Sequence, residues 1–412
     1  MREAGLLVVG ASLAGLRAVE AARATGYSGP ITLIGAERHL PYDRPPLSKA
    51  FLRDEEPAVP TLADAHALAA LNVDVRLGEA ADGLCLEERE VMAGGRCVPF
   101  DSLVIATGCA PVTLAGTESM ADTAGMNGVN GVHTLRTLDD ARAVRRHVLA
   151  GARTVLVGGG FIGAEVATAL RARGSSVTIV EAADVPLVRA AGRVVAPLLA
   201  ALHARAGVDL RCGVSVRRVS DGPDGRRVVL SDGSVLTADL VLVGVGARPT
   251  TGWLAGSGLG VDDGVLCDET LRAAPGVYAA GDVARWHNPL FGTAMRLENR
   301  TAAAELGAAA GRHAVDPSAA TAVSAVPYFW SDWYGSRIQM VGVVEADEVH
   351  VVGDPDGGSW AALHRRGDRV VGALTVGRPR QIMKYRAMIA RRAPWTVARE
   401  FAGAPSGVGG SA

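Results

Sequence analysis

The chain has 412 residues, more than one hydrophobic core usually serves, so we expect two or three domains. Its formal net charge of −1 gives no global attraction to nucleic acid or to a membrane surface, and we expect neither as a partner. The five cysteines include no closely spaced pair, which argues against a disulfide framework, a metal site and a redox-active dithiol.

The amino-terminal segment has no targeting pattern. It enters a strand pattern at residue 6 without a charged region and a long apolar run before it, so we expect no signal peptide. No apolar run reaches the length of a membrane span. We therefore expect a soluble, cytoplasmic protein.

Strand and helix patterns alternate through the first 250 residues, as in an α/β protein. The chain is 49% hydrophobic and has 51 glycines, which suits packed layers with tight turns. A strand–helix–strand pattern over 6–34 recurs over 154–180, and two such units predict two Rossmann-like nucleotide-binding domains. Further strands are expected at 73–77, 83–86, 89–92, 102–106 and 239–244.

The composition changes after Pro317. Aromatic residues cluster at 328–334, and alternating patterns predict strands at 337–343, 348–352, 360–364 and 369–376. Helices are expected from after Met295 to about Arg312 and over 380–391. The Gly- and Ser-rich residues 402–412 are expected to be a disordered tail.

A glycine-rich turn opens the first helix pattern. Gly10 permits the tight turn of a dinucleotide fingerprint, and Gly15 permits close packing of helix and strand. Ser12 replaces the middle glycine, and its hydroxyl could compensate by donating a hydrogen bond to phosphate. Glu37 follows Gly15 at about the spacing expected for a ribose-binding acid. A glycine-rich turn that binds no ligand is the alternative.

The second turn has the complete fingerprint, with Gly158, Gly160 and Gly163 between a strand and a helix. Glu181 ends the next strand, where a carboxylate can bind both hydroxyls of an adenosine ribose and repel a 2′-phosphate. No arginine is adjacent to Glu181 to hold that phosphate. The sequence therefore favours NADH over NADPH.

Further segments resemble those of a known family. Residues 41–49 (PYDRPPLSK) resemble a flavin-lining segment, and residues 106–108 and 244–249 resemble the connections between an FAD and an NAD domain. Residues 277–283 (VYAAGDV) are similar to a flavin-binding signature, and Arg296 to Glu298 to the start of the helix that follows it. Residues 328–332 (YFWSD) resemble the opening of a C-terminal domain. The chain, up to about residue 400, thus resembles the FAD-dependent NADH:ferredoxin reductases of the putidaredoxin reductase, rhodocoxin reductase and dioxygenase reductase types.

The resemblance implies two Rossmann-like domains of the glutathione-reductase type and a C-terminal α+β interface domain. Residues 1–112 and 247–320 would form the FAD-binding domain, 113–246 the NAD-binding domain, and 321–401 the interface domain. Two departures from the family pattern are Ser12 and Arg300, which stands where relatives often carry tryptophan near the flavin. We expect them to change the surroundings of the flavin, and with them its potential, but not the fold.

The resemblance also implies the roles of individual residues. Asp282 would hold the ribityl chain, and Lys49 and Glu165 would form an ion pair beside the flavin. Phe161 would either cover the flavin ring or belong to the core, and the same alternatives apply to Trp330. The implied FAD-binding residues are Gly10, Ser12, Leu13, Ala14, Gly15, Glu37, Arg44, Pro45, Lys49, Ala106, Thr107, Gly108, Asp282, Glu298 and Trp330. The implied NAD-binding residues are Gly158, Gly160, Phe161, Ile162, Gly163, Glu181 and Gly246, and the implied catalytic residues are Lys49, Glu165 and Phe161.

The implied activity is that of an NADH:ferredoxin oxidoreductase, which passes electrons through FAD to a small iron–sulfur protein that serves a haem monooxygenase or a ring-hydroxylating dioxygenase. A flavin suits this task because it accepts a hydride and releases electrons singly. A disulfide substrate would require a cysteine pair in the helix 13–23, and a single-cysteine oxidase or peroxidase a cysteine near position 43; neither is present. A signalling or redox-sensing flavoprotein like apoptosis-inducing factor, and a reductase of another small acceptor such as rubredoxin, stay open.

Residues 361–400 are strongly basic, with ten arginine and lysine residues against Asp368 and Glu400. Ferredoxins are typically acidic, so such a field would speed and orient their encounter with this segment. We expect an acidic [2Fe–2S] or [3Fe–4S]-type ferredoxin to dock here, with a solvated helix face as the alternative. The chain is expected to act as a monomer or a homodimer.

Overall fold

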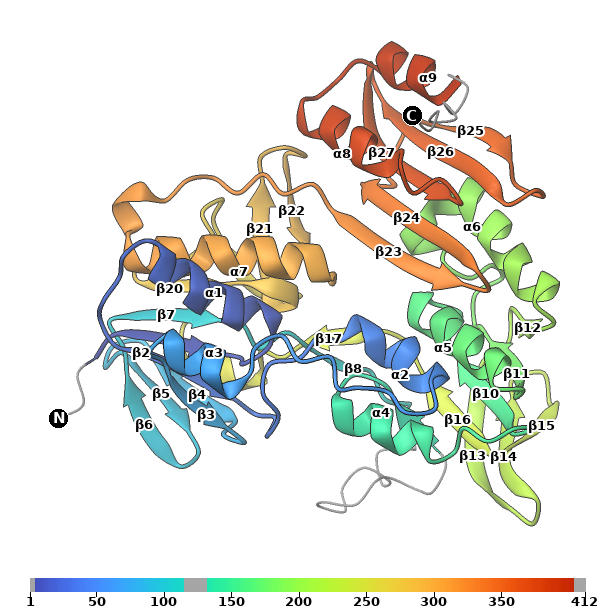
Figure 1. The fold of residues 1–412 in the computed structure, drawn as a ribbon, viewed down its shortest axis with the longest axis horizontal. Coiled ribbons are helices and arrows are strands. Elements are labelled where there is room, and N and C mark those ends of the chain that lie inside the picture. The colour runs from blue at the N-terminus through green and yellow to red at the C-terminus, as the bar shows by residue number, and fades with distance from the viewer. Residues whose placement is uncertain (1–3, 115–131, 404–412) are drawn as a thin grey trace, which may run out of the picture. The chain divides into compact units, whose positions relative to one another are not determined.

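The computed structural model describes residues 4–114 and 132–403. The chain forms two compact units, each assembled from segments that are distant in sequence (Figure 1). Unit 1 comprises Met1–Leu114, Thr134–Arg145 and Val245–Ala325, and unit 2 comprises Ala115–His133, Arg146–Gly244 and Val326–Ala412.

Unit 1 is built on a six-stranded sheet with the order β19-β20-β7-β1-β2-β3. The central strand β1 (Leu6–Val9) pairs in parallel with β2 (Ile31–Gly35) and β7 (Ser102–Ile105). All four residues of β1 are buried, because the sheet is covered on both faces. Strand β3 (Asp74–Leu77) pairs in parallel with β2, and β20 (Val277–Ala279) pairs in parallel with β7. The edge strand β19 (Arg272–Ala274) pairs antiparallel with β20.

Helices α1 (Leu13–Ala24) and α7 (Arg300–Val315) cover one face of this sheet (Figure 1). Two glycines of α7 allow their close approach: a Cβ atom on Gly307 would lie 2.3 Å from the carbonyl oxygen of Ala14, and one on Gly311 2.1 Å from that of Ala18. The other face is covered by an antiparallel sheet of β4 (Ala81–Cys85), β5 (Glu90–Ala93) and β6 (Arg96–Pro99).

The remaining elements of unit 1 are short. The 3₁₀ helix η1 (Pro45–Ser48) and helices α2 (Ala50–Arg53) and α4 (Leu138–Arg145) share a small core that includes Tyr42 and Phe51. The other elements are α3 (Ala65–Ala70), β8 (Cys109–Pro111), β17 (Ala247–Pro249), η3 (Gly252–Leu254), β18 (Val265–Cys267), η4 (Gly281–Val283), β21 (Ala284–Asn288), β22 (Thr293–Arg296) and η5 (Pro317–Ala319).

Unit 2 contains a second sheet of the same kind, with the order β12-β11-β10-β16-β9. Its central strand β10 (Arg153–Val157) pairs in parallel with β11 (Ser176–Val180) and β16 (Leu240–Val243). Helix α5 (Phe161–Ala172) follows β10 and α6 (Val188–Arg205) follows β11. The remaining strands are β9 (Val132–Thr134), β12 (Asp209–Arg211) and the antiparallel set β13 (Val216–Gly222), β14 (Gly225–Leu230) and β15 (Val235–Ala238).

The C-terminal part of unit 2 contains an antiparallel sheet with the order β23-β24-β27-β26-β25. Trp333, Ile338 and Trp360 of this sheet share a buried core with α5 and α6. Helices α8 (Ile382–Ala390) and α9 (Trp395–Gly403) follow the last strand. The strands are β23 (Tyr328–Trp333), β24 (Ser336–Gly342), β25 (Glu348–Asp354), β26 (Ser359–Arg366) and β27 (Arg369–Val376).

The predicted α/β class with two Rossmann-like units is confirmed, but one helix boundary is wrong. The helix expected after Met295 begins at Arg300, because residues 293–296 pair with β21 and Asn299 caps α7 through a bond from the amide of Ala302. Helices α2, α3, α4, α6 and α9 were not predicted; α6 contains Pro197 and a non-helical Gly192, which obscure its pattern.

The predicted tail overlaps the last helix. Ala402 and Gly403 belong to α9, and residues 404–412 lie outside the described part of the chain. Among the described residues, no helix combines the length and the apolar character that crossing a bilayer requires.

Candidate functional site

The first glycine turn lies between β1 and α1, at the carboxyl ends of the parallel strands of unit 1. Gly10 has φ +123°, and a Cβ atom there would lie 2.1 Å from the carbonyl oxygen of Ala106, just after β7. A Cβ atom on Gly15 would lie 1.9 Å from the carbonyl oxygen of Gly10. Neither position tolerates a side chain, so the turn stays tight and presents the first amides of α1, those of Leu13 and Ala14, at the strand ends.

Ser12, the departure from the fingerprint, is the N-cap residue of α1. It has an extended backbone (φ −114°, ψ −161°), and within the described chain its side chain makes no capping hydrogen bond. The serine therefore does not distort the turn. Its hydroxyl is not committed to the helix and can serve a bound anion.

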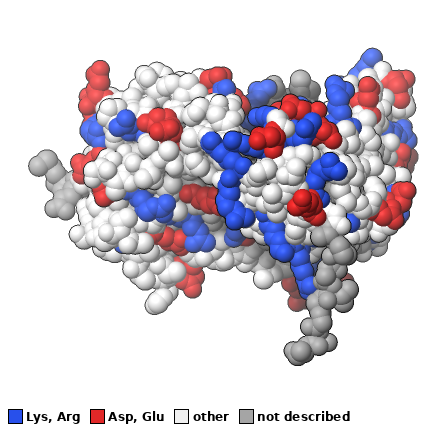
Figure 2. Space-filling model, turned by 90° about the horizontal axis from the view of Figure 1, so that it is seen from above, with Lys and Arg blue, Asp and Glu red and all other residues white. Residues whose placement is uncertain are grey.

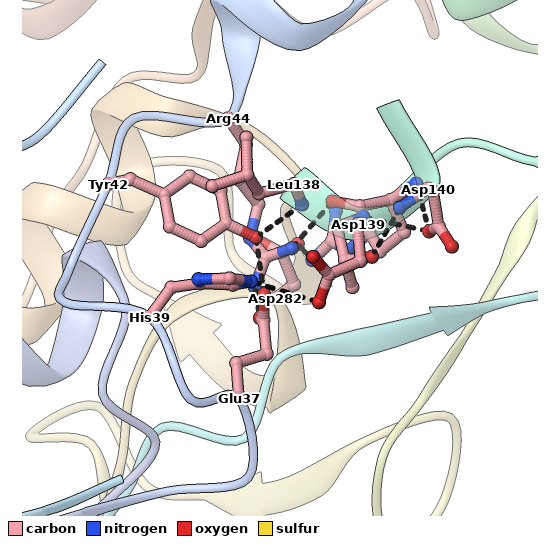
Figure 3. Close-up of polar contacts among 10 residues, drawn as sticks. Glu37, His39, Tyr42, Arg44, Leu138, Asp139, Asp140 and Asp282 are labelled. Carbon is pink, nitrogen blue, oxygen red and sulfur yellow. Dashed lines mark hydrogen bonds and ion pairs between the residues drawn. The ribbon is translucent and has the colours of Figure 1, made fainter. Parts of the chain in front are cut away.

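Glu37, which follows β2, is held by two side chains of residues 41–49, the segment expected to line the flavin (Figure 3). The hydroxyl of Tyr42 donates to its Oε2 at 2.5 Å, and Nη2 of Arg44 donates to its Oε1 at 2.6 Å. Burial raises the pKa of Tyr42, and the bond to Glu37 adds to this effect, so Tyr42 stays a neutral donor. A carboxylate can accept about four hydrogen bonds, so these two leave room for ribose hydroxyls.

Arg136 connects this cluster to Asp282. Its carbonyl oxygen accepts a bond from Nη1 of Arg44 at 2.6 Å, and its own Nη2 donates to Oδ2 of Asp282 at 2.8 Å. Burial acts to lower the pKa of Arg136, but the charge of Asp282 and the bond to it outweigh burial and raise the pKa. Arg136 thus stays a cation between the two acids expected to hold FAD.

Arg136 was not among the predicted site residues, although the sequence carries a signal for its placement. Thr137 and Asp140 form a capping box at the start of α4: the amide of Asp140 donates to Oγ1 of Thr137 at 3.1 Å, and Oδ2 of Asp140 accepts from the amide of Thr137 at 2.8 Å. The same Oδ2 accepts from the amide of Arg136 at 2.9 Å. The T-x-x-D spacing therefore fixes the backbone from which Arg136 extends.

Asp282 lies in η4, directly after β20. The preceding Gly281 has φ +72°, and a Cβ atom there would lie 3.0 Å from that of Ala14, so this loop packs on the first turn of α1. The carbonyl oxygen of Asp282 accepts from Arg296, which also pairs with Glu298 at 2.6 Å. The two predicted FAD-binding loops therefore lie side by side.

Cys109, buried beside Asp282, is a thiol rather than a thiolate. Burial raises its pKa to about 12, and the charges of Asp282 and Glu298 act in the same direction. A thiolate is the reactive form of cysteine, so this side chain is not suited to nucleophilic or disulfide chemistry.

Arg300 forms an ion pair with residues 41–49, the segment expected to line the flavin. It is the first residue of α7, and its Nε lies 2.7 and 2.9 Å from the two carboxylate oxygens of Asp43. In that segment Nζ of Lys49 donates to the carbonyl oxygen of Pro45 at 3.4 Å. The arginine thus ties the segment 41–49 to the start of α7.

The predicted connections between domains also meet in unit 1. Gly108 has φ +65°, and Oγ1 of Thr107 donates to the carbonyl oxygen of Thr250 at 2.9 Å. Strands β8 and β17 then pair antiparallel. Gly246, with φ +125°, stands just before β17 and belongs to unit 1, so it is not in the same unit as the other predicted NAD-binding residues.

The second glycine turn lies between β10 and α5 in unit 2. Gly158 has φ +104°, and a Cβ atom on Gly163 would lie 2.5 Å from its carbonyl oxygen, whereas Gly160 faces open space. Glu181, at the end of β11, reaches this turn: its Oε2 accepts from the amide of Gly159 at 2.8 Å, and its Oε1 from that of Ala183 at 2.9 Å. The carboxylate is thus fixed beside the turn where a dinucleotide would lie.

The start of α5 is the other part of the predicted NAD site. Phe161 is partly buried, with its ring centroid 4.6 Å from that of Phe329, and Ile162 is 46% exposed. Glu165 is buried and accepts a bond from Ser331. Trp330, in β23, stacks on Tyr328 with 5.9 Å between the ring centroids. Lys49 is in unit 1 and Glu165 in unit 2, so their pairing stays a prediction.

Two family models together match most of the chain. Residues 5–307 match the pyridine nucleotide-disulphide oxidoreductase family, and residues 328–403 match the reductase C-terminal family. The chain belongs to these flavoprotein reductases. Membership implies FAD and NAD(H) as the two nucleotides, and the uncrowded Gly160 and the acids at both turns fit them.

The relatives define the branch more closely. The chain is 36% identical to the ferredoxin–NAD(+) reductase component of the anthranilate 1,2-dioxygenase system of Burkholderia cepacia over 93% of both chains. It is 34% identical to putidaredoxin reductase of Pseudomonas putida over 94% of this chain and 92% of the relative. The structure of a covalent putidaredoxin reductase–putidaredoxin complex matches with a TM-score of 0.88 and 33% identity, covering 95% of this chain and 94% of that one.

Proposed function

We propose that the chain is an NADH-dependent ferredoxin reductase, which passes electrons from NADH through FAD to a small iron–sulfur protein that serves an oxygenase. The observation that carries the proposal is the likeness, over nine-tenths of the chain, to reductases whose names state this reaction. The two glycine turns, each with an acid at the end of the next strand, supply sites for the two nucleotides that the reaction needs.

Residues 1–112 with 247–320 are proposed to bind FAD, and residues 113–246 to bind NADH. Glu37 holds the adenosine ribose of FAD, and Asp282 with Arg136 holds its ribityl chain. Glu181 holds the adenosine ribose of NADH. FAD, when bound, accepts a hydride and releases electrons one at a time.

The nicotinamide end of NADH is assigned to the start of α5. Glu165 meets the carboxamide of the ring and pairs with Lys49 beside the flavin. Phe161 covers the flavin face until the nicotinamide displaces it, and Trp330 borders the flavin edge. A cation fixed near the flavin stabilises the negative charge that forms when the flavin is reduced. This stabilisation is effective because the cation is already in place and the site does not have to reorganise.

The electron acceptor is proposed to be an acidic ferredoxin that docks on a basic surface formed by α8, α9 and the residues before them. We call this the basic surface and define it by the exposed Arg380, Lys384, Arg391, Arg392 and Arg399. Arg365 and Arg369 contribute less to its field, because they pair with Glu348 and Asp368.

The decisive experiment measures the NADH-dependent reduction of cytochrome c by the FAD-loaded protein, with and without a [2Fe–2S] ferredoxin. A large increase of the rate on adding ferredoxin supports the proposal. Rubredoxin, tested in parallel, distinguishes a reductase of another small acceptor. A protein that binds FAD and NADH but is indifferent to both acceptors would instead favour a signalling role like that of apoptosis-inducing factor.

A further inference from the structure

A buried chain of hydrogen bonds joins α5, the helix after the second glycine turn, to the C-terminal sheet. The hydroxyl of Ser331 donates to Oε1 of Glu165 at 2.5 Å, and the indole N–H of Trp333 donates to that hydroxyl at 2.7 Å. Glu165 is 4% exposed, Ser331 1% and Trp333 0%. Both β23 residues and the helix lie in unit 2.

The direction of each bond in this chain follows from the chemistry of the groups. An indole N–H can only donate, so Oγ of Ser331 must accept it. The single proton of that hydroxyl is then directed at Glu165, whose Oε1 accepts. Because all three groups are buried, removal of either donor removes a hydrogen bond in surroundings where water does not readily replace it. The chain therefore holds Glu165 in one orientation.

Other contacts fix the same face of α5 against the same strand. Oγ1 of Thr168 accepts from the amide of Tyr334 at 3.2 Å, and the ring centroid of Phe161 lies 5.6 Å from that of Trp333. Positions 161, 165 and 168 share one face of a helix. The face that begins at the glycine turn is thus attached to β23 near its carboxyl end by packing and by two hydrogen bonds.

We propose that Ser331 and Trp333 are positioning residues for the nicotinamide half of NADH: they hold the carboxylate of Glu165 where it meets the carboxamide of the ring. The inference rests on the proposed function, in which Glu165 has that contact. It makes recognition of the nicotinamide a joint property of the nucleotide-binding helix and the C-terminal sheet, whereas the adenosine half depends on Glu181 and the glycine turn.

Because the two halves of NADH depend on different residues, a ligand with the nicotinamide ring and one without it should respond differently to the variants. The dissociation constants of NAD⁺ and of ADP-ribose, which lacks the nicotinamide ring, are measured by titration calorimetry on the FAD-loaded protein. Ser331→Ala should weaken NAD⁺ binding by about tenfold, the effect of one hydrogen bond to a charged group. Trp333→Phe should weaken it by about fivefold, because the indole donates to a neutral hydroxyl. ADP-ribose should bind as to the unchanged protein. Trp286→Phe is the matched control, since it removes a buried indole N–H that donates instead to Val323 in unit 1.

The Glu165→Gln variant distinguishes a failure of the positioning role from a failure of the proposed contact between Glu165 and the nicotinamide carboxamide. If Glu165→Gln weakens NAD⁺ but neither Ser331→Ala nor Trp333→Phe does, the positioning role is wrong while the contact of Glu165 stands. If Glu165→Gln has no effect, both are wrong. Equal weakening of NAD⁺ and ADP-ribose by the two donor variants would show only a structural role and would also overturn the inference. Reduction of ferredoxin tests the proposed function independently of all three results.

Discussion

Glu181 is the residue on which the choice of nucleotide depends. Its two oxygens accept from the amides of Gly159 and Ala183, so the carboxylate cannot turn away from a ligand at the turn without losing both bonds. A carboxylate held there accepts from ribose hydroxyls and opposes a phosphate dianion at the same place. The preference for NADH should therefore be strong and should reside in this one side chain.

Replacement of Glu181 by Ala together with Ala182→Arg tests this preference. The change removes the negative charge and offers a cation to the 2′-phosphate, so the ratio of kcat/KM for NADH to that for NADPH should fall by at least about tenfold. Steady-state kinetics with both nucleotides measures the ratio. Ala182→Arg alone is the control, because it retains the carboxylate. An unchanged ratio in the double variant would mean that Glu181 faces away from the ribose.

Lys49 is the cation expected to assist the reduction of the flavin. Lys49→Met preserves the length of the side chain and removes its charge, so hydride transfer from NADH should slow by about tenfold or more if the cation stabilises the reduced flavin. Stopped-flow absorbance measures the step directly. Lys384→Met is the matched control, since it removes the other lysine, which is exposed and lies over the ring of Phe401. Equal rates for the two variants would leave Lys49 a surface residue.

At the scale of an element, the flavin-lining segment is held by side chains from distant parts of unit 1. Tyr42 and Arg44 donate hydrogen bonds to Glu37, and Arg300 at the start of α7 forms an ion pair with Asp43. The ion pair of Arg300 is partly buried, with side-chain exposures of 32% and 23%, so it is screened less than a surface pair. We interpret this ion pair as a contact that fixes residues 41–49 against the start of α7.

Loss of the ion pair between Arg300 and Asp43 should weaken the binding of FAD without unfolding the protein. Arg300→Ala should raise the dissociation constant of FAD by about three- to tenfold, measured from the recovery of flavin fluorescence on dilution. The exchange variant, with Asp43→Arg and Arg300→Asp, restores the opposite charges and should recover most of the affinity. If Arg300→Ala retains FAD as firmly as the original protein, the ion pair is only a surface contact.

The contrast between the glycine turns and Arg136 indicates which parts of the site a sequence can predict. Gly10, Gly15 and Glu37 act within one strand–helix–strand unit, where the chain geometry alone sets the spacing. Arg136 meets Asp282, and Ser331 meets Glu165, across more than 140 residues of sequence. Such contacts depend on how the segments pack, so their residues appear only in the structure. The boundary of α7 was wrong for a related reason: the pairing of β22 with β21 overrides the local helix pattern.

At the scale of the whole molecule, two buried histidines predict an acid-sensitive unit 2. Burial lowers the pKa of His203 and of His364 to about 4, well below the usual value near 6.5. Between these values the unfolded chain binds protons that the folded chain does not, so stability falls as the pH falls from about 6.5 to 4. Each histidine can contribute a loss on the order of 3 kcal/mol.

Urea unfolding of unit 2 at pH 7 and pH 4.5, followed by the fluorescence of its tryptophans, measures this loss. His203→Gln and His364→Gln should each lower the stability at pH 7 and reduce the difference between the two pH values. The exposed His66 in unit 1 is the control, and His66→Gln should change neither quantity. If the difference between the two pH values persists in both variants, it arises from other groups.

The distribution of charge over the molecule bears on the approach of the acceptor. Acidic and basic side chains are interspersed over the face in Figure 2. A second candidate docking face lies in unit 1 around Arg44 and Arg53, but its positive charge is compensated, because these residues pair with Glu37 and Asp54. The basic surface on α8 and α9 therefore offers the better field for an acidic partner.

Electrostatic docking predicts that the rate of ferredoxin reduction depends on ionic strength, whereas a helix face that is only solvated predicts no such dependence. The second-order rate of ferredoxin reduction should fall steeply between low and high ionic strength, because the screening length shrinks from about 10 Å at 0.1 M to about 3 Å at 1 M. Arg380→Glu with Lys384→Glu should raise KM for ferredoxin and weaken its salt dependence, while reduction of the flavin by NADH stays unchanged. Arg217→Glu with Arg218→Glu, exposed on β13 of the same unit, is the control of equal charge change. If both double variants behave alike, net charge governs the encounter; if neither salt nor reversal matters, ferredoxin docks on another face.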